Sequence, residues 1–162
     1  MFTRRQFMQT AAAFVVTTST AFYKENDALM DEDEAAGMPD EGEPHKRTWM
    51  AFGASEEIWG KEILPEAQRN LAAIALAIAD YEPVSMLVRE EDYEIAEELV
   101  GSKVELVVFP IDDLWMRDTG PVFVTQANGS KAAINFNFNG WGEKQDFDRD
   151  SKVAGLLHNG LG

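Results

Sequence analysis

Apolar runs of strand length alternate along this chain with segments whose apolar residues recur at helical spacing. The strand-like runs cover residues 48–52, 84–88 and 104–109, and the helix-like segments between them cover residues 64–78 and 90–100. Such short alternation is typical of the α/β class. Pro65 suits the first turn of the longer helix. Periodicity alone leaves two architectures open, a doubly wound sheet and a propeller built of αβ modules.

Turn residues organise the second half of the chain. Asn128 and Gly129 separate strand candidates at residues 121–125 and 132–138, which predicts a β-hairpin. A further helix-like segment begins at residue 147. The hairpin and this helix extend the α/β pattern to the end of the sequence.

The first 28 residues carry the features of an export signal. Arg4 and Arg5 form a twin-arginine pair, and an apolar run at residues 11–16 leads to small residues suited to cleavage. The run is too short to span a membrane, which takes ~20 apolar residues. A first amphipathic helix is the alternative, but no polar face of helical period passes through the run. We therefore expect residues 1–28 to direct export to the periplasm or the cell exterior.

An acidic linker is expected at residues 29–43. Its centre has four consecutive carboxylates at residues 31–34, and large apolar groups are few, so the segment buries too little surface to order itself. A calcium site is the alternative, but adjacent carboxylates cannot all face one ion, and the ligand spacing of an EF-hand loop is missing. Residues 44–162 then form the folded region.

Composition excludes several kinds of chemistry. The chain has no cysteine, which removes thiol nucleophiles, disulfides and thiolate metal sites, and it has two histidines, His45 and His158. A compact metal centre or a Ser-His-Asp triad is therefore not expected. The net charge of -15 argues against a nucleic-acid partner and suits a cationic small molecule, although acidic surfaces more often serve solubility.

One loop concentrates the functional groups of the chain. Residues 111–121, between a predicted strand and the hairpin, contain three carboxylates, an arginine and an indole. A carboxylate binds a guanidinium by two parallel charge-assisted hydrogen bonds, and an aromatic face beside it adds a cation–π attraction of ~0.5–2 kcal/mol. The loop is therefore suited to gripping a guanidinium cation, with Asp118 held by the turn at Gly120 and Pro121.

The same residue types allow a structural alternative. In it, Arg117 pairs with Asp112 or Asp113 while Trp115 packs in the core, and the loop binds no ligand. Residue types alone leave these two hypotheses about equal.

Four sequence blocks resemble the agmatine deiminase family, which is related to bacterial peptidylarginine deiminases. They are MPDEGEPH at residues 38–45, TWMA at 48–51, DDLWMRDTGP at 112–121 and FNGWG at 138–142. Their order and spacing match the family, and the resemblance covers residues 38–162. It implies a pentein fold, a propeller of five αβ modules, of which this chain would supply the first module and part of the second.

The resemblance also implies roles for individual residues. In this family a cysteine thiolate attacks the guanidinium carbon, a histidine transfers protons, and two acidic side chains hold the guanidinium nitrogens. Asp118 matches one of these acidic residues and is expected to bind substrate. Trp115 is expected to form a wall of the pocket, and Asp113 is a weaker candidate for substrate binding. Arg117 is assigned to loop structure, because it would repel a cationic substrate.

The family's cysteine and histidine motifs have no counterpart in these 162 residues. No residue is therefore assigned a catalytic role, and neither His45 nor His158 is expected to be the catalytic histidine. Trp141, in the last block, is expected to be a buried anchor at the hairpin end more than a pocket residue.

The activity implied by the resemblance is hydrolysis of agmatine to N-carbamoylputrescine and ammonia, on a route to putrescine, with this chain alone inactive. Two alternatives are a protein-arginine deiminase and a non-catalytic exported protein that binds guanidinium or polyamine cations. No metal or organic cofactor is implied, and the oligomeric state is left open.

Overall fold

The computed structural model describes residues 36–40, 42–44 and 46–160. The chain divides into two compact units, one formed by Met1–Gly37 and Thr125–Lys131 and the other by Met38–Val124 and Ala132–Gly162. The predicted signal at residues 1–28 lies outside the described residues, as do His45 and part of the predicted linker. Export and the linker therefore stay predictions.

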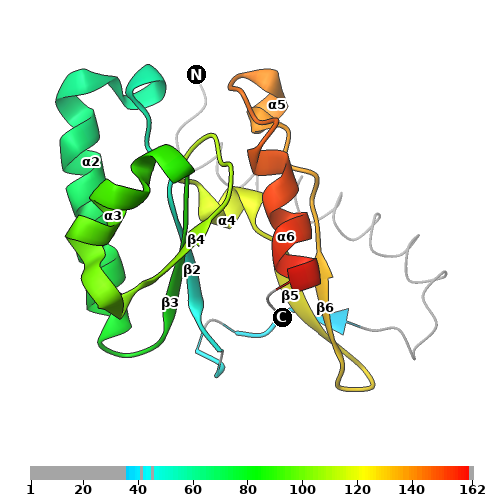
Figure 1. The fold of residues 1–162 in the computed structure, drawn as a ribbon. Coiled ribbons are helices and arrows are strands. Elements are labelled where there is room, and N and C mark those ends of the chain that lie inside the picture. Colours follow the sequence, from blue (N-terminus) through cyan, green and yellow to red (C-terminus); the bar gives the residue numbers. More distant parts are fainter. Residues whose placement is uncertain (1–35, 41, 45, 161–162) are drawn as a thin grey trace, which may run out of the picture. The chain divides into compact units, whose positions relative to one another are not determined.

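A three-stranded parallel sheet forms the centre of the larger unit (Figure 1). Its strands are β2 (Thr48–Phe52), β3 (Val84–Val88) and β4 (Glu105–Val108), and β3 lies in the middle. These strands confirm the three apolar runs of the sequence. β3 is buried along its whole length, as is typical of a middle strand covered on both faces.

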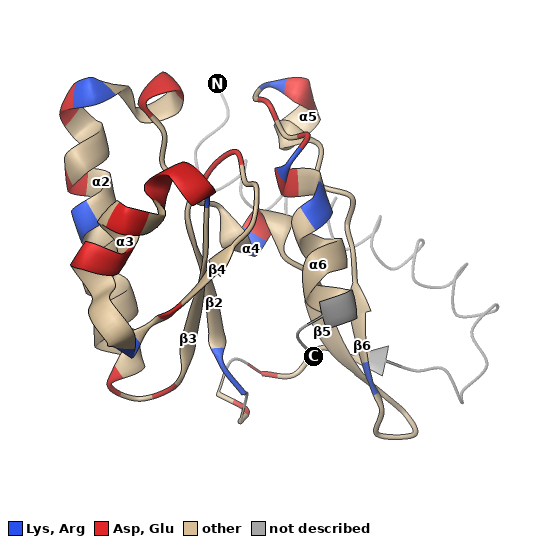
Figure 2. Ribbon diagram, in the orientation of Figure 1, with Lys and Arg blue, Asp and Glu red and all other residues tan. Residues whose placement is uncertain are grey.

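Two helices, α2 (Glu56–Ala79) and α3 (Tyr93–Val100), cover one face of this sheet. α2 changes direction at Gly60, whose φ of 72° is not helical. Pro65 therefore lies inside a helix that begins earlier than expected, and the prediction that it occupies a first turn is wrong. α3 continues a short 3-10 turn, η2 (Glu90–Asp92), and red ribbon in Figure 2 marks the acidic positions of both elements.

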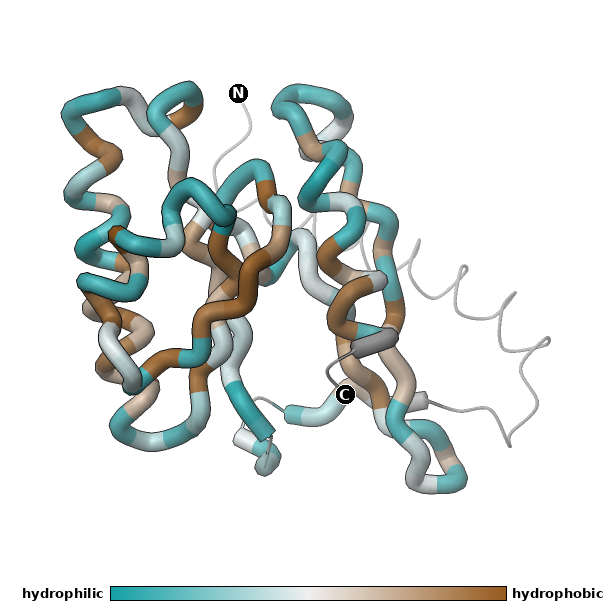
Figure 3. The backbone as a smooth tube through the Cα atoms, in the orientation of Figure 1, coloured by the Kyte–Doolittle hydropathy of each residue, from teal (hydrophilic) through white to brown (hydrophobic). Residues whose placement is uncertain are grey.

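The opposite face of the sheet is covered by α6 (Val153–Gly160), which follows the 3-10 turn η4 (Asp150–Lys152). Successive residues of β3 serve different cores, because side chains alternate across a strand. Met86 packs with α2 and α3, whereas Leu87 packs with Val153 and Leu157 of α6. Figure 3 shows the hydrophobic stretches in the strands and in α6.

The predicted hairpin is formed by β5 (Val122–Gln126) and β6 (Lys131–Ile134), and β1 (Ala36–Gly37) pairs antiparallel with the end of β5. β6 ends at Ile134 and not at residue 138 as expected. The reason is local: Asn137 has φ 55°, and its backbone N–H donates to the Asn135 side chain at 2.8 Å. Such a side-chain hydrogen bond competes with strand pairing.

Parallel strands alternating with helices confirm the α/β class. The five-module propeller stays a prediction, because the described residues form two separate three-stranded sheets. Within the described part of the chain, no helix is long and apolar enough to cross a membrane.

Two aspartates tie the segment after β4 to the start of α6. Asp150 is buried and accepts hydrogen bonds from the backbone N–H groups of Asp112 (2.8 Å) and Asp113 (3.3 Å). In return, the Asp112 carboxylate accepts from the backbone N–H groups of Arg149 (2.8 Å) and Asp150 (3.1 Å). Burial, together with the negative charges of Asp112 and Asp113, raises the pKa of Asp150 from 3.8 to about 6.

Gly53, which follows β2, lies directly against the backbone of Asp113. A methyl group added at Gly53 would lie 2.1 Å from the Asp113 carbonyl oxygen, far inside van der Waals contact. We therefore expect Gly53→Ala to lower the free energy of unfolding by about 1–3 kcal/mol, as overpacking does. Urea unfolding measures the change.

The matched control for this substitution is Gly155→Ala. Gly155 lies in α6, and apart from its chain neighbours and the backbone of its own helix no described atom lies within 4 Å of the methyl group it would gain. Since alanine is the better helix former, the control should raise the free energy of unfolding by up to about 1 kcal/mol. Equal stability of the two variants would contradict the close contact at Gly53.

The raised pKa of Asp150 predicts a pH-dependent stability. A carboxyl group whose pKa is raised on folding stabilises the fold below its ordinary pKa and loses that contribution as the pH rises through its folded pKa. For Asp150 the loss runs from about pH 4 to above about pH 6. Asp150→Asn does not titrate, so its free energy of unfolding relative to the unmodified chain should rise between these limits, by roughly 2 kcal/mol.

Urea unfolding of both proteins at several pH values tests this expectation. Loss of one backbone hydrogen bond in Asp150→Asn adds an offset that does not depend on pH, so only the change in the difference is diagnostic. A difference that stays constant across the range would contradict the raised pKa.

Candidate functional site

The site is built where the loops after β2 and β4 meet. In parallel α/β sheets, ligands bind in the crevice outside the carboxyl ends of the strands. The chain leaves β2 through Gly53 towards α2, and it leaves β4 through residues 109–115 towards the one-turn helix α4 (Met116–Thr119). The contact between Gly53 and the Asp113 backbone fixes these two loops against each other.

Arg89 holds the first of these loops in place. Its guanidinium is buried and donates to the backbone carbonyl oxygens of Gly53 and Ala54, both at 2.9 Å. The same side chain pairs with Asp92 at 2.6 Å, so its charge is balanced within the fold. Arg89 thus connects the end of β3 to the loop that carries the chain into α2.

Asp113 occupies the centre of the site. Its side chain is 2% exposed and accepts hydrogen bonds from two indoles, those of Trp59 (Nε1 to Oδ1, 2.9 Å) and Trp115 (Nε1 to Oδ2, 2.8 Å). It also accepts from the Leu114 backbone N–H at 2.9 Å and from Gln145 Nε2 at 3.2 Å. These four donors match the roughly four acceptor positions of a carboxylate. Direct contact of Asp113 with a substrate stays a prediction.

Asp118 lies in α4 and is exposed to solvent. Its Oδ1 accepts one hydrogen bond, from Trp141 Nε1 at 3.2 Å. In the part of the chain that the structure describes, no cation pairs with Asp118, and its second oxygen accepts no hydrogen bond. The carboxylate therefore keeps acceptor capacity for a ligand, in contrast to Asp113.

Aromatic rings surround these two carboxylates. Trp115 is 40% exposed, stacks on Trp59 with ring centroids 6.4 Å apart, and meets Trp141 edge-on at 6.0 Å. Trp141 also meets Phe138 edge-on at 5.0 Å. The three tryptophans thus form one contiguous aromatic surface, and each donates its indole N–H to Asp113 or Asp118.

A strained turn presents Trp141 to Asp118. Trp141 has φ 55° and Gly140 φ 62°, and the Asn139 side chain accepts from the Gly142 backbone N–H at 2.9 Å within α5 (Gly140–Glu143). A methyl group on Gly140 would lie 2.3 Å from the Gln145 carbonyl oxygen, so only glycine fits there. Left-handed backbone at a bulky residue is costly and is often found at functional sites.

The structural alternative for this loop is wrong in both of its parts. Asp112 binds the start of α6 and Asp113 binds the indoles, so neither pairs with Arg117. Trp115 is partly exposed and does not pack in the core. Sequence reasoning also expected Trp141 to be a buried anchor, but it is 39% exposed and bonded to Asp118.

Sequence reasoning missed Trp59 and Gln145. Both lie far from the loop in sequence, and only folding brings them to Asp113. Trp59 stands at the start of an amphipathic helix, where an aromatic residue gives no functional signal. For Gln145, the sequence gives one indication, its position just after the FNGWG block at residues 138–142.

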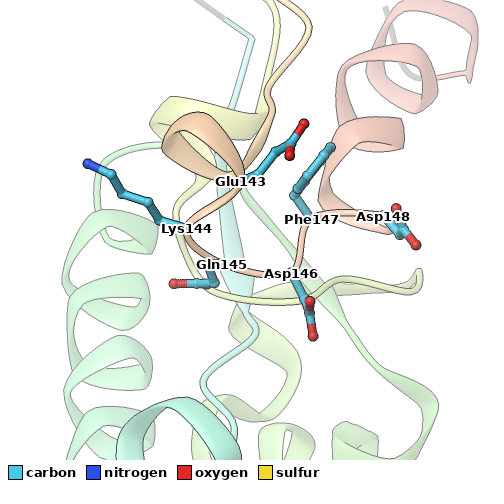
Figure 4. A pocket seen from close by; sticks show the side chains of 6 residues that line it. All are labelled: Glu143, Lys144, Gln145, Asp146, Phe147 and Asp148. Carbon is cyan, nitrogen blue, oxygen red and sulfur yellow. The ribbon is translucent and has the colours of Figure 1, made fainter.

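Two hollows lie near the site, and Asp118 lines neither. One, of about 480 Å³, is bordered by residues 143–148, whose side chains point in different directions from one continuous stretch (Figure 4). The other, of about 250 Å³, has Trp115 as one wall and is mainly apolar. Asp118 is exposed outside both hollows.

No metal centre is formed by the described residues, since they contain no group of three or more His, Asp or Glu side chains that could hold an ion. His158 is exposed on α6. The functional groups of the site are carboxylates and indoles, a set suited to an organic cation.

Known proteins share both the sequence and the fold of this region. An agmatine deiminase of Stutzerimonas stutzeri is 38% identical over 123 residues, and a Streptomyces coelicolor protein whose name assigns it to the same enzyme class is 43% identical over 121 residues. Each match covers 72% of this chain but only 33% and 35% of the relative. The chain thus spans about a third of the length of these curated relatives.

A solved structure of agmatine deiminase from Enterococcus faecalis superposes with a TM-score of 0.68 at 25% identity, covering 75% of this chain and 34% of that one. The sequence profile of Porphyromonas-type peptidyl-arginine deiminases matches residues 37–161, which include every residue of the site. The chain therefore belongs to the Porphyromonas-type peptidyl-arginine deiminase family, and its relatives there include agmatine deiminases.

Proposed function

We propose that Asp118, with Trp115 and Trp141, binds the guanidinium group of a small cationic substrate. The observation that carries the proposal is an exposed carboxylate with unused acceptor capacity beside two oriented indoles. A planar guanidinium can donate two N–H groups to such a carboxylate while its face lies against an aromatic ring. The net charge of -15 favours a cation over an anion.

Agmatine is the substrate that the relatives favour. We propose that the protein to which this chain corresponds hydrolyses agmatine to N-carbamoylputrescine and ammonia, because curated relatives that it matches carry the name agmatine deiminase. The reaction expected from the family resemblance is addition of a thiolate to the guanidinium carbon and loss of ammonia, followed by attack of water on the resulting alkylthiouronium. The carbon–sulfur bond then breaks, which releases the ureido product and returns the thiolate. Asp118 would hold the guanidinium nitrogens during these steps.

Protein-arginine deimination is the second candidate. The matching family profile is that of Porphyromonas-type peptidyl-arginine deiminases. This name supports the arginine side chain of a peptide as the substrate. The two substrates share the guanidinium and differ at the far end, where agmatine has an amine and peptidyl-arginine has a backbone. A chain that binds guanidinium or polyamine cations without catalysis is the third possibility.

Export and the complete propeller are also proposals. The twin-arginine pair Arg4 and Arg5 supports export to the periplasm or cell exterior. The likeness to an agmatine deiminase fold, with a third of that protein covered, supports a pentein propeller of which this chain supplies the first module and part of the second.

Asp118→Asn tests the binding site. The substitution removes the negative charge and replaces one acceptor oxygen by an NH₂ donor. Because a guanidinium group has only donors, agmatine should bind about 10- to 100-fold more weakly. Isothermal titration calorimetry measures the Kd. Asp80→Asn is the matched control, because Asp80 is an exposed carboxylate that pairs with Lys103 at the end of α2 and should leave the Kd unchanged.

The choice of ligand separates the three candidates. Agmatine, putrescine and an N-acetyl-arginine amide should be titrated in parallel, since putrescine lacks the guanidinium and the amide mimics peptidyl-arginine. We expect agmatine to bind tightest and putrescine weakest. Equal binding of agmatine and putrescine, or equal effects of Asp118→Asn and Asp80→Asn, would overturn the proposed guanidinium site.

Turnover should be absent from this chain by itself. The proposed reaction needs a thiolate nucleophile, and the 162 residues contain no cysteine. Assay of the purified chain for ureido product and ammonia from agmatine should therefore give the rate of a heat-treated sample. Clear turnover above that background would rule out the thiolate mechanism for these residues.

A further inference from the structure

We propose that Asp113 is a positioning residue, which acts on the ligand through the indoles of Trp59 and Trp115. This inference rests on the proposed guanidinium site, because it concerns what holds the aromatic wall beside Asp118. The family resemblance makes Asp113 a candidate for direct contact with substrate, but its surroundings favour a different role.

The burial of Asp113 argues against direct contact. Its side chain is 2% exposed, and two indole N–H groups, one backbone N–H and the Gln145 amide all donate to it. A carboxylate has about four acceptor positions, so a ligand donor would have to displace one of these partners. Asp118 keeps free acceptor capacity and needs no such displacement.

The chemistry of the four partners requires a side chain with two acceptor oxygens. All four are donors, and a carboxylate is the side chain that accepts on both oxygens. Asparagine would place an NH₂ group against at least one of these donors, and leave a buried donor unsatisfied. Because the two oxygens serve different tryptophans, one substitution disturbs both rings.

A continuous series of contacts joins Asp113 to Asp118. Asp113 fixes the Trp115 indole, Trp115 meets Trp141 edge-on at 6.0 Å, and Trp141 donates to Asp118 at 3.2 Å. Trp115 and Trp141 are both partly exposed, so the orientation of these two rings defines the face offered to a cation. Without the hydrogen bond to Asp113, the Trp115 ring can rotate about its side-chain bonds, and the aromatic wall no longer has one fixed orientation.

The first test uses the chain without ligand, so it does not depend on the proposed function. With isotope-labelled tryptophan, NMR detects the indole N–H of each of the four tryptophans. Asp113→Asn should shift the resonances of Trp59 and Trp115 and leave that of Trp49 in place. Unchanged resonances of both Trp59 and Trp115 would overturn the positioning role.

A second variant keeps the test decisive if Asp113→Asn does not fold. Trp59→Phe keeps a ring at this position and removes one of the two donors to Oδ1 of Asp113, leaving the Leu114 backbone N–H in place. The Trp115 indole donates to the other oxygen, Oδ2. Its N–H resonance should therefore shift no more than the backbone amide resonances of the same variant do. A Trp115 resonance that moves to the position of an unbonded indole would show that Asp113 does not anchor that ring by itself.

The second test asks whether Asp113 acts through Trp115. Asp113→Asn and Trp115→Phe should each weaken agmatine binding about tenfold, and the double variant should bind no more weakly than either single one, because both remove the same link. Multiplied losses in the double variant would instead show that Asp113 contacts agmatine independently. If the unmodified chain does not bind agmatine, the proposed function fails, while the ligand-free resonances still decide the positioning role.

Discussion

Hydrogen bonds from tryptophan indoles to two aspartates, the buried Asp113 and the exposed Asp118, organise the candidate site. Three of the four tryptophans donate to Asp113 or Asp118, and their rings contact one another in sequence. An indole is a large apolar ring with a single donor, so a carboxylate at that donor sets the direction of the whole ring. The aromatic wall of the site therefore depends on where two carboxylates are held.

Those carboxylates are held by contacts that also define the fold. The Asp113 backbone is fixed on one side by Gly53 and on the other by Asp150 at the start of α6. Three aspartates of one short segment have different roles. Asp112 caps the start of a helix, Asp113 anchors indoles, and Asp118 is exposed to solvent. Substitutions in this loop should accordingly affect stability and binding in different proportions.

Much of the fold could be predicted from residue patterns, because apolar periodicity reports directly on burial. The positions of the three central strands and the α/β class followed from it, and the hairpin followed from the Asn128–Gly129 turn. The early start of α2 did not, because an earlier helical piece, which the apolar pattern does not indicate, joins the predicted helix across the kink at Gly60. The early end of β6 depends on a local hydrogen bond between Asn135 and Asn137 that competes with pairing.

The site was only partly predictable for a related reason. The DDLWMRDTGP block identified the loop, but nothing in its residue types separates a buried carboxylate such as Asp113 from an exposed one such as Asp118. That difference arises from Trp59 and Gln145, which come from other segments. Trp141 was assigned to the core because tryptophan is usually buried, whereas its left-handed backbone turns it towards Asp118.

The central claim is that agmatine binds at the Asp118 carboxylate beside Trp141. An NMR titration of the chain with agmatine, followed at the indole N–H of Trp141, tests it most directly, because this group is bonded to the carboxylate that would receive the ligand. We predict that the Trp141 resonance moves and saturates with agmatine, and that it does not move in Asp118→Asn. A Trp141 resonance that stays fixed while agmatine binds elsewhere would contradict the account.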